Sequence, residues 1–194
     1  MLNTSPVPQE PASPHPPGPD GHAGGVSNDE FRAAMSRLAA GVVLVTLQEP
    51  PLDPEGPGGE DAGMTATGFM SLSLEPPLVL LSVRQGSRMH DLLTDQPLWA
   101  VSVLSESQRT IADRFAMKGR VSDRLLFRDL PCTRGRLTGA PLVDGALAAL
   151  ECRTEQRVPA GDHVLVIARV LATALSDTDA PPLTYFRGRY RGLA

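Results

Sequence analysis

The sequence has few residues that bind zinc or form disulfides. Among its 194 residues, Cys132 and Cys152 are the only cysteines, and they are not in a CxxC pair. This spacing argues against a zinc site and against a disulfide framework. We therefore expect no bound metal. Both thiols are expected to be reduced and buried, which is typical of a cytoplasmic protein.

Positive charge and long apolar runs are also scarce. The formal net charge is -4, so a broad basic surface for nucleic acid is not indicated. Lys118 is the only lysine, so arginine carries nearly all the positive charge. That bias is compatible with bidentate phosphate binding and equally with codon usage. No apolar run is long enough to span a bilayer, and no signal peptide is recognisable.

Two segments are rich in residues that do not build a core. Residues 1–27, dominated by Pro, Gly, Ser and His, are predicted to be a disordered arm. His15 and His22 in this arm are more typical of solvated side chains than of a metal site. Residues 49–62, rich in Pro, Gly and acidic residues, are expected to form a long hairpin tip. The rest, residues 28–194, is enough for one domain.

The stretch Gly63–Pro77 is the centre of the chain's organisation. Its apolar residues alternate with Thr and Ser, a pattern typical of a strand buried on one face. Its hydroxyls and free main-chain N–H groups at a strand end are suited to an anion such as phosphate. A plain Ser/Thr-rich strand on a wet sheet face is the alternative. The following run, residues 78–83, is predicted to be a fully buried strand.

Other segments predict about seven or eight strands with two or three helices. A helix is expected from Asn28 to Gly41, with Phe31, Met35 and Leu38 on one apolar face. Further strands are expected at residues 42–47, 98–104, 147–153, around 158, 164–171 and 183–185. Further helices are expected at residues 89–94 and 105–115. Residues 120–134 are expected to be irregular. Short links between strands favour a closed antiparallel sheet. No GxGxxG or P-loop pattern occurs.

Ordered blocks of residues then give the chain a resemblance to the flavin reductase family, the reductase components of two-component flavin monooxygenases. The resemblance runs from Phe31 to Leu193. The blocks are Phe31–Met35, Ala40–Val42, Gly63–Thr67, Ser71–Leu78, Val101–Leu104, Arg114–Ala116, Gly139–Leu142, Gly145–Ala148, Leu150–Cys152, Gly161–His163 and Tyr185–Tyr190.

This resemblance implies a mainly β fold, a split β-barrel of antiparallel strands with a few flanking helices. It also implies a homodimer that binds FMN or FAD near the subunit interface and reduces it with NADH or NADPH. The reduced flavin would then pass to a separate monooxygenase. In such proteins the flavin is often a substrate rather than a fixed prosthetic group.

The resemblance also implies site residues. The flavin would lie against Gly63, Met64, Thr65, Ala66 and Thr67. Its phosphate end would meet Ser82, Val83, Arg84, Ser87 and Arg88, with help from Arg114 and Phe115. Tyr185, Arg187 and Tyr190 would shape the nicotinamide dinucleotide site, and His163 would lie beside the nicotinamide.

Hydride transfer needs close stacking more than it needs a protein acid, so His163 is expected to position or tune rather than to donate a proton. Each residue has a simpler alternative. His163 would cap a turn, Arg84 and Arg88 would be surface charges, Phe115 would be core, and Tyr190 would be a packed anchor.

The chain departs from the family at three positions. Ala40, Gly68 and Ser102 stand where Thr, Ser and Asn are frequent, and Gly68 removes a hydroxyl that a phosphate would use. Two rival functions remain open at this point. One is a flavin-binding protein without reductase activity. The other is an FMN oxidase of the pyridoxamine-phosphate oxidase type, which needs more cationic phosphate ligands than the sequence offers.

Overall fold

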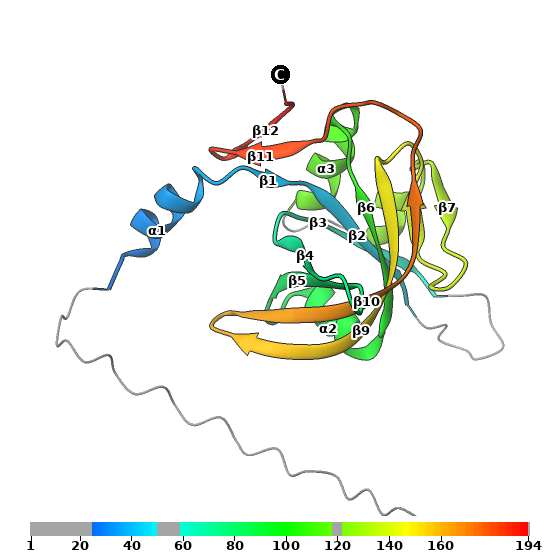
Figure 1. The fold of residues 1–194 in the computed structure, drawn as a ribbon, viewed down its shortest axis with the longest axis horizontal. Coiled ribbons are helices and arrows are strands. Elements are labelled where there is room, and N and C mark those ends of the chain that lie inside the picture. Colours follow the sequence, from blue (N-terminus) through cyan, green and yellow to red (C-terminus); the bar gives the residue numbers. More distant parts are fainter. Residues whose placement is uncertain (1–24, 50–58, 118–121, 194) are drawn as a thin grey trace, which may run out of the picture.

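A seven-stranded antiparallel sheet dominates the fold (Figure 1). The computed structural model describes residues 25–49, 59–117 and 122–193. The strand order in the large sheet is β3-β2-β6-β9-β10-β5-β4. The bounds of these strands are β2 (Val43–Gln48), β3 (Asp61–Ala66), β4 (Phe69–Ser73), β5 (Leu78–Arg84), β6 (Leu98–Val103), β9 (Ala148–Ala160) and β10 (His163–Leu175). The prediction of a mainly β, antiparallel fold is confirmed.

Smaller elements surround this sheet. A second sheet has the order β1-β11-β12, and β7 pairs with β8 alone. Their bounds are β1 (Ala40–Gly41), β7 (Cys132–Arg134), β8 (Pro141–Val143), β11 (Thr184–Phe186) and β12 (Arg189–Arg191). The helices are α1 (Asn28–Met35), α2 (Arg88–Asp95), the short 3₁₀ helix η1 (Glu106–Gln108), α3 (Arg109–Ala116) and α4 (Asp123–Phe127).

The barrel is split between β3 and β4. These two strands follow each other in the sequence, joined by Thr67 and Gly68, yet they occupy the two ends of the sheet order. The last β3 pair with β2 is Ala66 with Val43, and the first β4 pair with β5 is Phe69 with Leu81. Thr67 and Gly68 therefore form a corner outside both ladders, and both residues are exposed.

Two apolar clusters hold the sheet on its two sides. One contains Trp99, Leu81, Val101 and the apolar face of α2, with Met89 and Leu93 buried. The other packs α3 and α4 on the opposite side of β2, around Leu44, Leu104 and Phe115. Because both faces of β2 are covered, its residues from Val43 to Leu47 are all buried, as its continuous β-branched run predicted.

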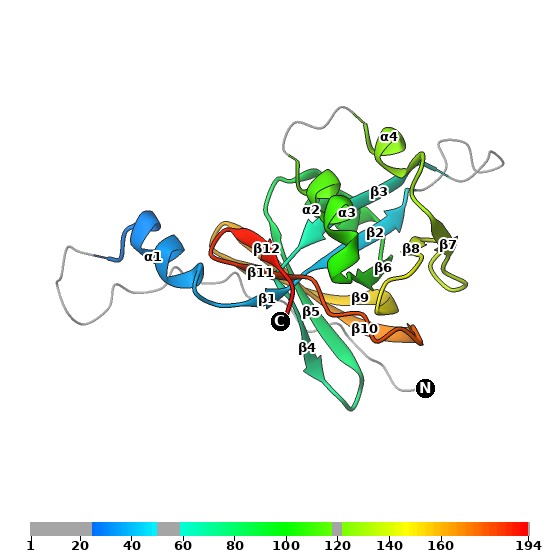
Figure 2. The same cartoon turned by 90° about the horizontal axis from the view of Figure 1, so that it is seen from above.

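The N-terminal helix ends earlier than predicted. α1 stops at Met35, because Ala40 and Gly41 pair as a strand with Tyr185 and Thr184. Its start is as expected, with a capping box between Ser27 and Glu30. The predicted apolar face is wrong as a core face, since α1 buries no residue. Figure 2 shows α1 standing off from the barrel.

The central stretch is not one strand. Residues 63–77 contain the end of β3, the corner, β4 and a turn, and β4 exposes Met70 and Leu72, at 56% and 43%. β4 is the edge strand of the large sheet, in the β4–β5 hairpin (Figure 2), and its outer face is not covered by the other residues that the structure describes. The strand at residues 78–83 is also not fully buried, since burial alternates along β5.

Residues 120–134 contain more regular structure than the sequence indicated. α4 and β7 both lie there, and their short lengths explain why no periodic pattern revealed them. Both cysteines are free. Cys152 is buried as predicted, whereas Cys132 on the two-stranded β7–β8 sheet is partly exposed. Burial raises the pKa of the Cys152 thiol to about 12, so this thiol stays protonated.

Several predictions lie outside the described residues. These are the arm up to residue 24, most of the 49–62 loop, and Lys118 with its neighbours. None of the helices in the part of the chain that the structure describes has the length and apolar character that a bilayer crossing requires.

Candidate functional site

The Gly-Asp-His turn joins the two longest strands, β9 and β10. Gly161 has a φ of 63°, which glycine adopts at little cost, and the turn places His163 at the first position of β10. Nδ1 of His163 lies 2.8 Å from Oδ1 of Asp162, and the imidazole side chain is 42% exposed. A proton on Nδ1 that is donated to Asp162 leaves Nε2 free as an acceptor toward solvent or ligand. The same hydrogen bond lowers the pKa of Asp162.

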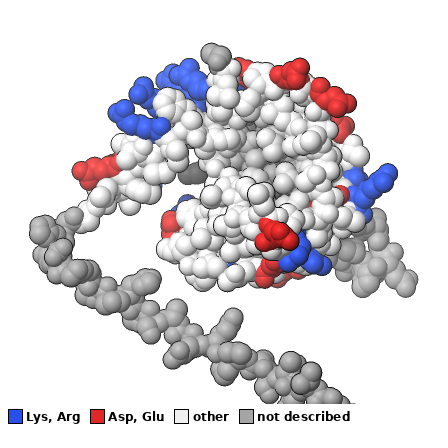
Figure 3. Space-filling model, viewed as in Figure 1, with Lys and Arg blue, Asp and Glu red and all other residues white. Residues whose placement is uncertain are grey.

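His163 lies beside a cleft between α1 and the large sheet. Strand register puts His163 directly across from Arg84 of β5. The cleft has a volume of about 380 Å³ and is lined by Asn28, Phe31, Arg32, Arg84, Asp162 and His163. Figure 3 shows the molecule hollowed between α1 and the lower half of the barrel. The structure thus brings Arg84 together with His163.

The β3 residues predicted to contact a flavin lie over α3. The Thr65 hydroxyl donates to the Ala112 carbonyl at 2.8 Å, so it is committed to the helix. Gly63 and Ala66 are buried, Met64 and Thr65 are half-buried, and Thr67 is exposed at the corner. Met64 packs against the core, so a cofactor at this strand end would meet chiefly the Thr67 side chain and the main chain of the corner.

Gly63 is packed against two aromatic rings. A Cβ at this position would lie 2.9 Å from Phe115 and 2.9 Å from Phe127. These rings form an edge-to-face pair with centroids 4.9 Å apart. Phe115 is 1% exposed, so it lies in the core beneath β3 rather than on a surface that a ligand would reach.

Residues of β5 approach the corner from the other side. The Ser82 N–H donates to the Gly68 carbonyl at 2.8 Å, and a Cβ on Gly68 would come within 3.1 Å of the Ser82 Cβ. Glycine at position 68 therefore allows the corner to lie close to β5. Val83 is 1% exposed, which leaves only its main chain for any ligand.

Ser87 and Arg88, the rest of the predicted phosphate clamp, already have partners. The Ser87 hydroxyl accepts the His90 N–H at 3.3 Å and so caps α2. Nε of Arg88 lies 3.0 Å from Oδ2 of Asp123, whose side chain is 1% exposed, and the guanidinium also pairs with Glu49. A phosphate at Arg88 would compete with both carboxylates.

Arg114 ties α3 to α4. Its Nη1 donates to the Leu126 carbonyl at 3.2 Å. Together with Phe115 and Phe127, this bond holds α4 over the start of β3. Arg114 therefore supports the predicted flavin strand from below.

Tyr185, Arg187 and Tyr190 lie on the C-terminal hairpin β11–β12. The two tyrosine rings are opposite each other in register, with centroids 5.4 Å apart. Burial raises the pKa of Tyr190, whose ring packs on the core. Arg187, with a φ of 51°, donates its N–H to the Ser36 carbonyl at 2.8 Å and so anchors the hairpin just after α1.

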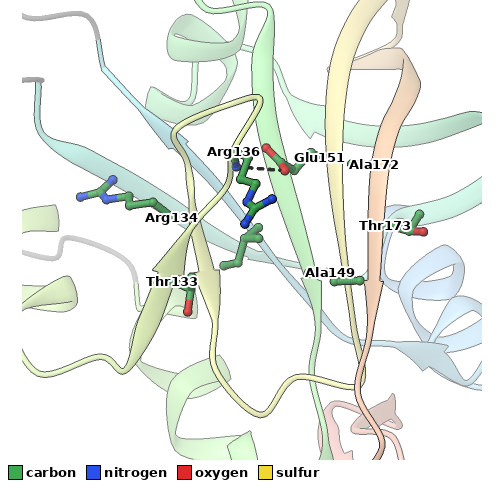
Figure 4. A pocket seen from close by; sticks show the side chains of 9 residues that line it. Thr133, Arg134, Arg136, Ala149, Glu151, Ala172 and Thr173 are labelled. Atoms are coloured by element: carbon green, nitrogen blue, oxygen red, sulfur yellow. Dashed lines mark hydrogen bonds between the residues drawn. The ribbon is translucent and has the colours of Figure 1, made fainter.

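A second cavity of about 400 Å³ lies under the β7–β8 loop (Figure 4). At its end the Glu151 carboxylate accepts the N–H groups of Leu137 and Thr138, each at 2.8 Å, and that of Arg136 at 3.1 Å. Although burial favours the protonated form, these bonds and the Thr138 hydroxyl lower the pKa of Glu151. The Arg134 guanidinium pairs instead with Asp61, with Nη1 2.5 Å from Oδ1. The charges of Glu151 and Arg134 at this cavity are thus paired within the protein.

Sequence reasoning missed two features. Phe31 and Arg32 line the His163 cleft, although the helical spacing of Phe31 with Met35 indicated a core face. The second feature is the set of N–H groups around the Glu151 carboxylate. The signal for it was an acidic residue within an apolar strand, since a buried acid normally has hydrogen-bond partners. Among the residues that the structure describes, no group of three or more His, Cys, Asp or Glu side chains forms a metal site.

Comparison with known proteins identifies the family. The model of the flavin reductase like domain matches residues 35–194. The chain belongs to the flavin reductase family.

The reductase component of a 4-hydroxyphenylacetate 3-monooxygenase from Thermus thermophilus is 38% identical over 165 residues, covering 85% of this chain and 96% of that protein. An NADH-dependent flavin reductase from Pseudomonas fluorescens is also 38% identical, covering 84% of this chain and 88% of its own length. Among solved structures, the Streptomyces globisporus NADH:FAD oxidoreductase in complex with NAD and FAD fragments has a TM-score of 0.75 at 33% identity. The structural match covers 86% of this chain and 92% of the Streptomyces globisporus chain.

Proposed function

We infer that this protein is an NAD(P)H:flavin oxidoreductase that reduces FMN or FAD and supplies the reduced flavin to a monooxygenase. The observation that carries this inference is membership of the flavin reductase family over residues 35–194. The similar proteins with known reductants use NADH, so NADH is the reductant that we propose here. The partner monooxygenase follows from the relative that is a monooxygenase component.

The flavin site that we propose lies at the β3–β4 corner, along Gly63, Met64, Thr65, Ala66 and Thr67. The corner supports this placement because Thr67 and Gly68 lie outside both strand ladders. The Gly68 carbonyl already accepts the Ser82 N–H, so we propose that the main-chain N–H groups of the corner contact the flavin. When bound, the flavin supplies the ring that accepts a hydride. The chain contributes main-chain N–H groups that would stabilise negative charge on that ring.

For the flavin's phosphate end, Ser82, Ser87 and the Val83 main chain stay as proposed contacts. Arg84, predicted for the same role, lies across from His163 in the cleft beside α1, so we propose it for the reductant instead. Arg88 would first have to leave Asp123 or Glu49. Arg114 and Phe115 would act indirectly, by holding α3 and α4 against β3.

His163 is proposed to position the nicotinamide. Asp162 fixes the imidazole by accepting at Oδ1, and Nε2 is then the atom presented to a ligand. Tyr185, Arg187 and Tyr190 are proposed to shape the dinucleotide site from the hairpin that anchors the end of α1. No step requires a proton from the protein, because hydride transfer is governed by distance and orientation.

The direct test of the activity is oxidation of NADH by the purified protein with added FMN or FAD. Loss of nicotinamide absorbance is expected with NADH and at least one flavin. The absence of turnover with both flavins and both nicotinamides would refute the proposed function. Tight flavin binding without NADH oxidation would instead identify a flavin carrier.

The role of His163 is tested separately by His163→Ala. Loss of one oriented hydrogen bond is expected to reduce kcat/KM for NADH about tenfold, because such a bond contributes roughly 1.5 kcal/mol. Flavin affinity, measured by quenching of flavin fluorescence, is expected to stay within twofold. An equal loss of flavin affinity would contradict the assignment.

We further propose that the protein is a homodimer. The exposed apolar residues of β4 and its turn, Met70, Leu72 and Leu74, support this proposal, since Leu74 is 91% exposed. An apolar edge of this kind commonly marks an interface between chains.

A further inference from the structure

We propose that the cleft between α1 and the β5–β10 edge binds the adenosine diphosphate part of the reductant, with Phe31 stacking on the adenine and Arg32 and Arg84 binding the diphosphate. This proposal rests on the proposed function, and it assigns a binding role to α1. The nicotinamide end of the same molecule would extend out of this cleft past His163, which is one of the lining residues.

The charges in the cleft suit a diphosphate. Arg32 and Arg84 are both exposed, and they come from opposite walls. The ion pair of Arg32 with Asp29 is 3.6 Å long between side chains that are 77% and 96% exposed, so it is weak and easily exchanged. The acidic Asp162 is bonded to His163. Two guanidinium groups thus face one small space, where each can bind phosphate oxygens in bidentate fashion.

Phe31 offers an unused aromatic face. It is 60% exposed, and α1 buries none of its residues against the barrel. A ring exposed in this way costs free energy unless something covers it, and a purine base is a suitable cover. Stacking of a base on an aromatic side chain commonly changes affinity roughly tenfold.

The position of α1 is fixed although its faces are not packed. A capping box closes its N-terminal turn, the Arg187 N–H holds the Ser36 carbonyl, and β1 pairs with β11 directly after it. Figure 1 shows α1 leading into β1, which lies beside β11, and α1 standing across from the tip of the β9–β10 hairpin. Phe31 and Arg32 are therefore presented toward His163 by a defined support.

The volume of the cleft favours a part of the dinucleotide rather than the whole. About 380 Å³ lies near the lower end of the range for ligand pockets, roughly 300–1,000 Å³. The corner residues Thr67 and Gly68 do not line this cleft. The adenosine diphosphate part of the reductant is thus a better occupant than the flavin ring.

The first experiment compares two reductants. Phe31→Ala and Arg32→Gln are each expected to raise KM for NADH about tenfold, with kcat within twofold of the parent. Neither is expected to affect 1-benzyl-1,4-dihydronicotinamide, which lacks the adenosine and the diphosphate. Met35→Ala and Arg37→Gln are matched controls from the same segment that do not line the cleft, and they should leave both reductants unaffected. Equal losses with both reductants, or no loss with NADH, would overturn the proposal.

The second experiment needs no turnover. Calorimetric titration of the flavin-free protein with ADP is expected to show binding that Arg32→Gln weakens at least fivefold and Arg37→Gln leaves unchanged. Absence of ADP binding at millimolar concentration would overturn the cleft assignment, whatever the activity. ADP binding in a protein without NADH oxidation would uphold the cleft and refute the reductase.

A final comparison distinguishes the two adenosine-containing molecules. If Phe31→Ala raises KM for FAD but not for FMN, and leaves KM for NADH unchanged, the cleft holds the flavin's adenosine and the proposal is wrong. A rise for NADH with unchanged FAD and FMN values is the expected result.

Discussion

At the scale of single residues, Gly63 shows how closely the predicted flavin strand is packed on the helices below it. Gly63→Ala would place a methyl group 2.9 Å from both Phe115 and Phe127. We expect a loss of about 1–3 kcal/mol in the free energy of unfolding, because the core would have to shift. Thermal unfolding should show a decrease of roughly 2–4 °C per kcal/mol.

Gly41→Ala is the matched control for this substitution, since a Cβ there has no atom within 4 Å. Its melting temperature should stay close to that of the parent protein. A Gly63→Ala protein as stable as the Gly41→Ala protein would contradict the packing described for β3.

Glu151 illustrates a second effect at this scale, the buried charge. Glu151→Gln is expected to cost about 2–3 kcal/mol in the free energy of unfolding, because the amide cannot accept all of the N–H groups now aimed at the carboxylate. Glu155→Gln, which removes an exposed pair with Arg169, should cost less than about 1 kcal/mol. Urea unfolding of the two variants measures this difference.

The pH dependence of the Glu151 contribution has a definite sign. Because the pKa of Glu151 is lowered from the usual 4.5 in the folded protein, its contribution is complete above that value and is lost as the pH falls through the folded pKa. The stability difference between parent and Glu151→Gln should therefore shrink between pH 7 and pH 3. A difference that stays constant over this range would argue against a charged Glu151.

At the scale of elements, α1 is positioned at its ends but has no packed face. It has eight residues, buries none of them, and is held only by its cap and by its C-terminal end. Short helices of this kind are marginal in water without packing. We expect α1 amides to exchange with deuterium much faster than those of β9 and β10, and to slow when ADP is added. Protection equal to that of β10 without ligand would contradict this expectation.

The same scale shows what sequence patterns can and cannot predict. The continuous Val43–Leu47 run and the helix over Met89 and Leu93 were predictable, because local periodicity matches burial there. The alternation in β4 was misleading, since Met70 and Leu72 point away from the core of their own chain. A local pattern does not say whether an apolar face is covered by the rest of the same chain.

The candidate site was predictable only in part for a related reason. The hairpin turn at Gly161 marked His163, and the strand register then placed Arg84 beside it. The partners of Arg88 come from residues far apart in sequence, Glu49 and Asp123, so no spacing rule could reveal them. The place of Phe31 in the cleft depends on the direction of the chain after α1. That direction is set by the pairing of β1 with β11, a strand far away in the sequence.

At the scale of the whole molecule, β4 and its turn present an exposed apolar face, for which we propose a second copy of the chain as the cover. We expect light scattering to give twice the mass of the chain, and Leu74→Asp to weaken dimerisation by tenfold or more, because a charge would enter an apolar interface. Leu175→Asp is a control at a residue that is 82% exposed at the end of β10. A monomeric parent protein, or equal effects of both substitutions, would refute the β4 interface.

The split between β3 and β4 has a consequence for how the family can vary. The two edge strands of the large sheet, β3 and β4, are joined by Thr67 and Gly68, so an inserted residue there would displace both edge strands. The connection from β2 enters β3 at its opposite end, about 20 Å away along six residues. Insertions or deletions between β2 and β3 therefore need not move the corner, so the length of that connection can change without altering the position of Thr67 and Gly68.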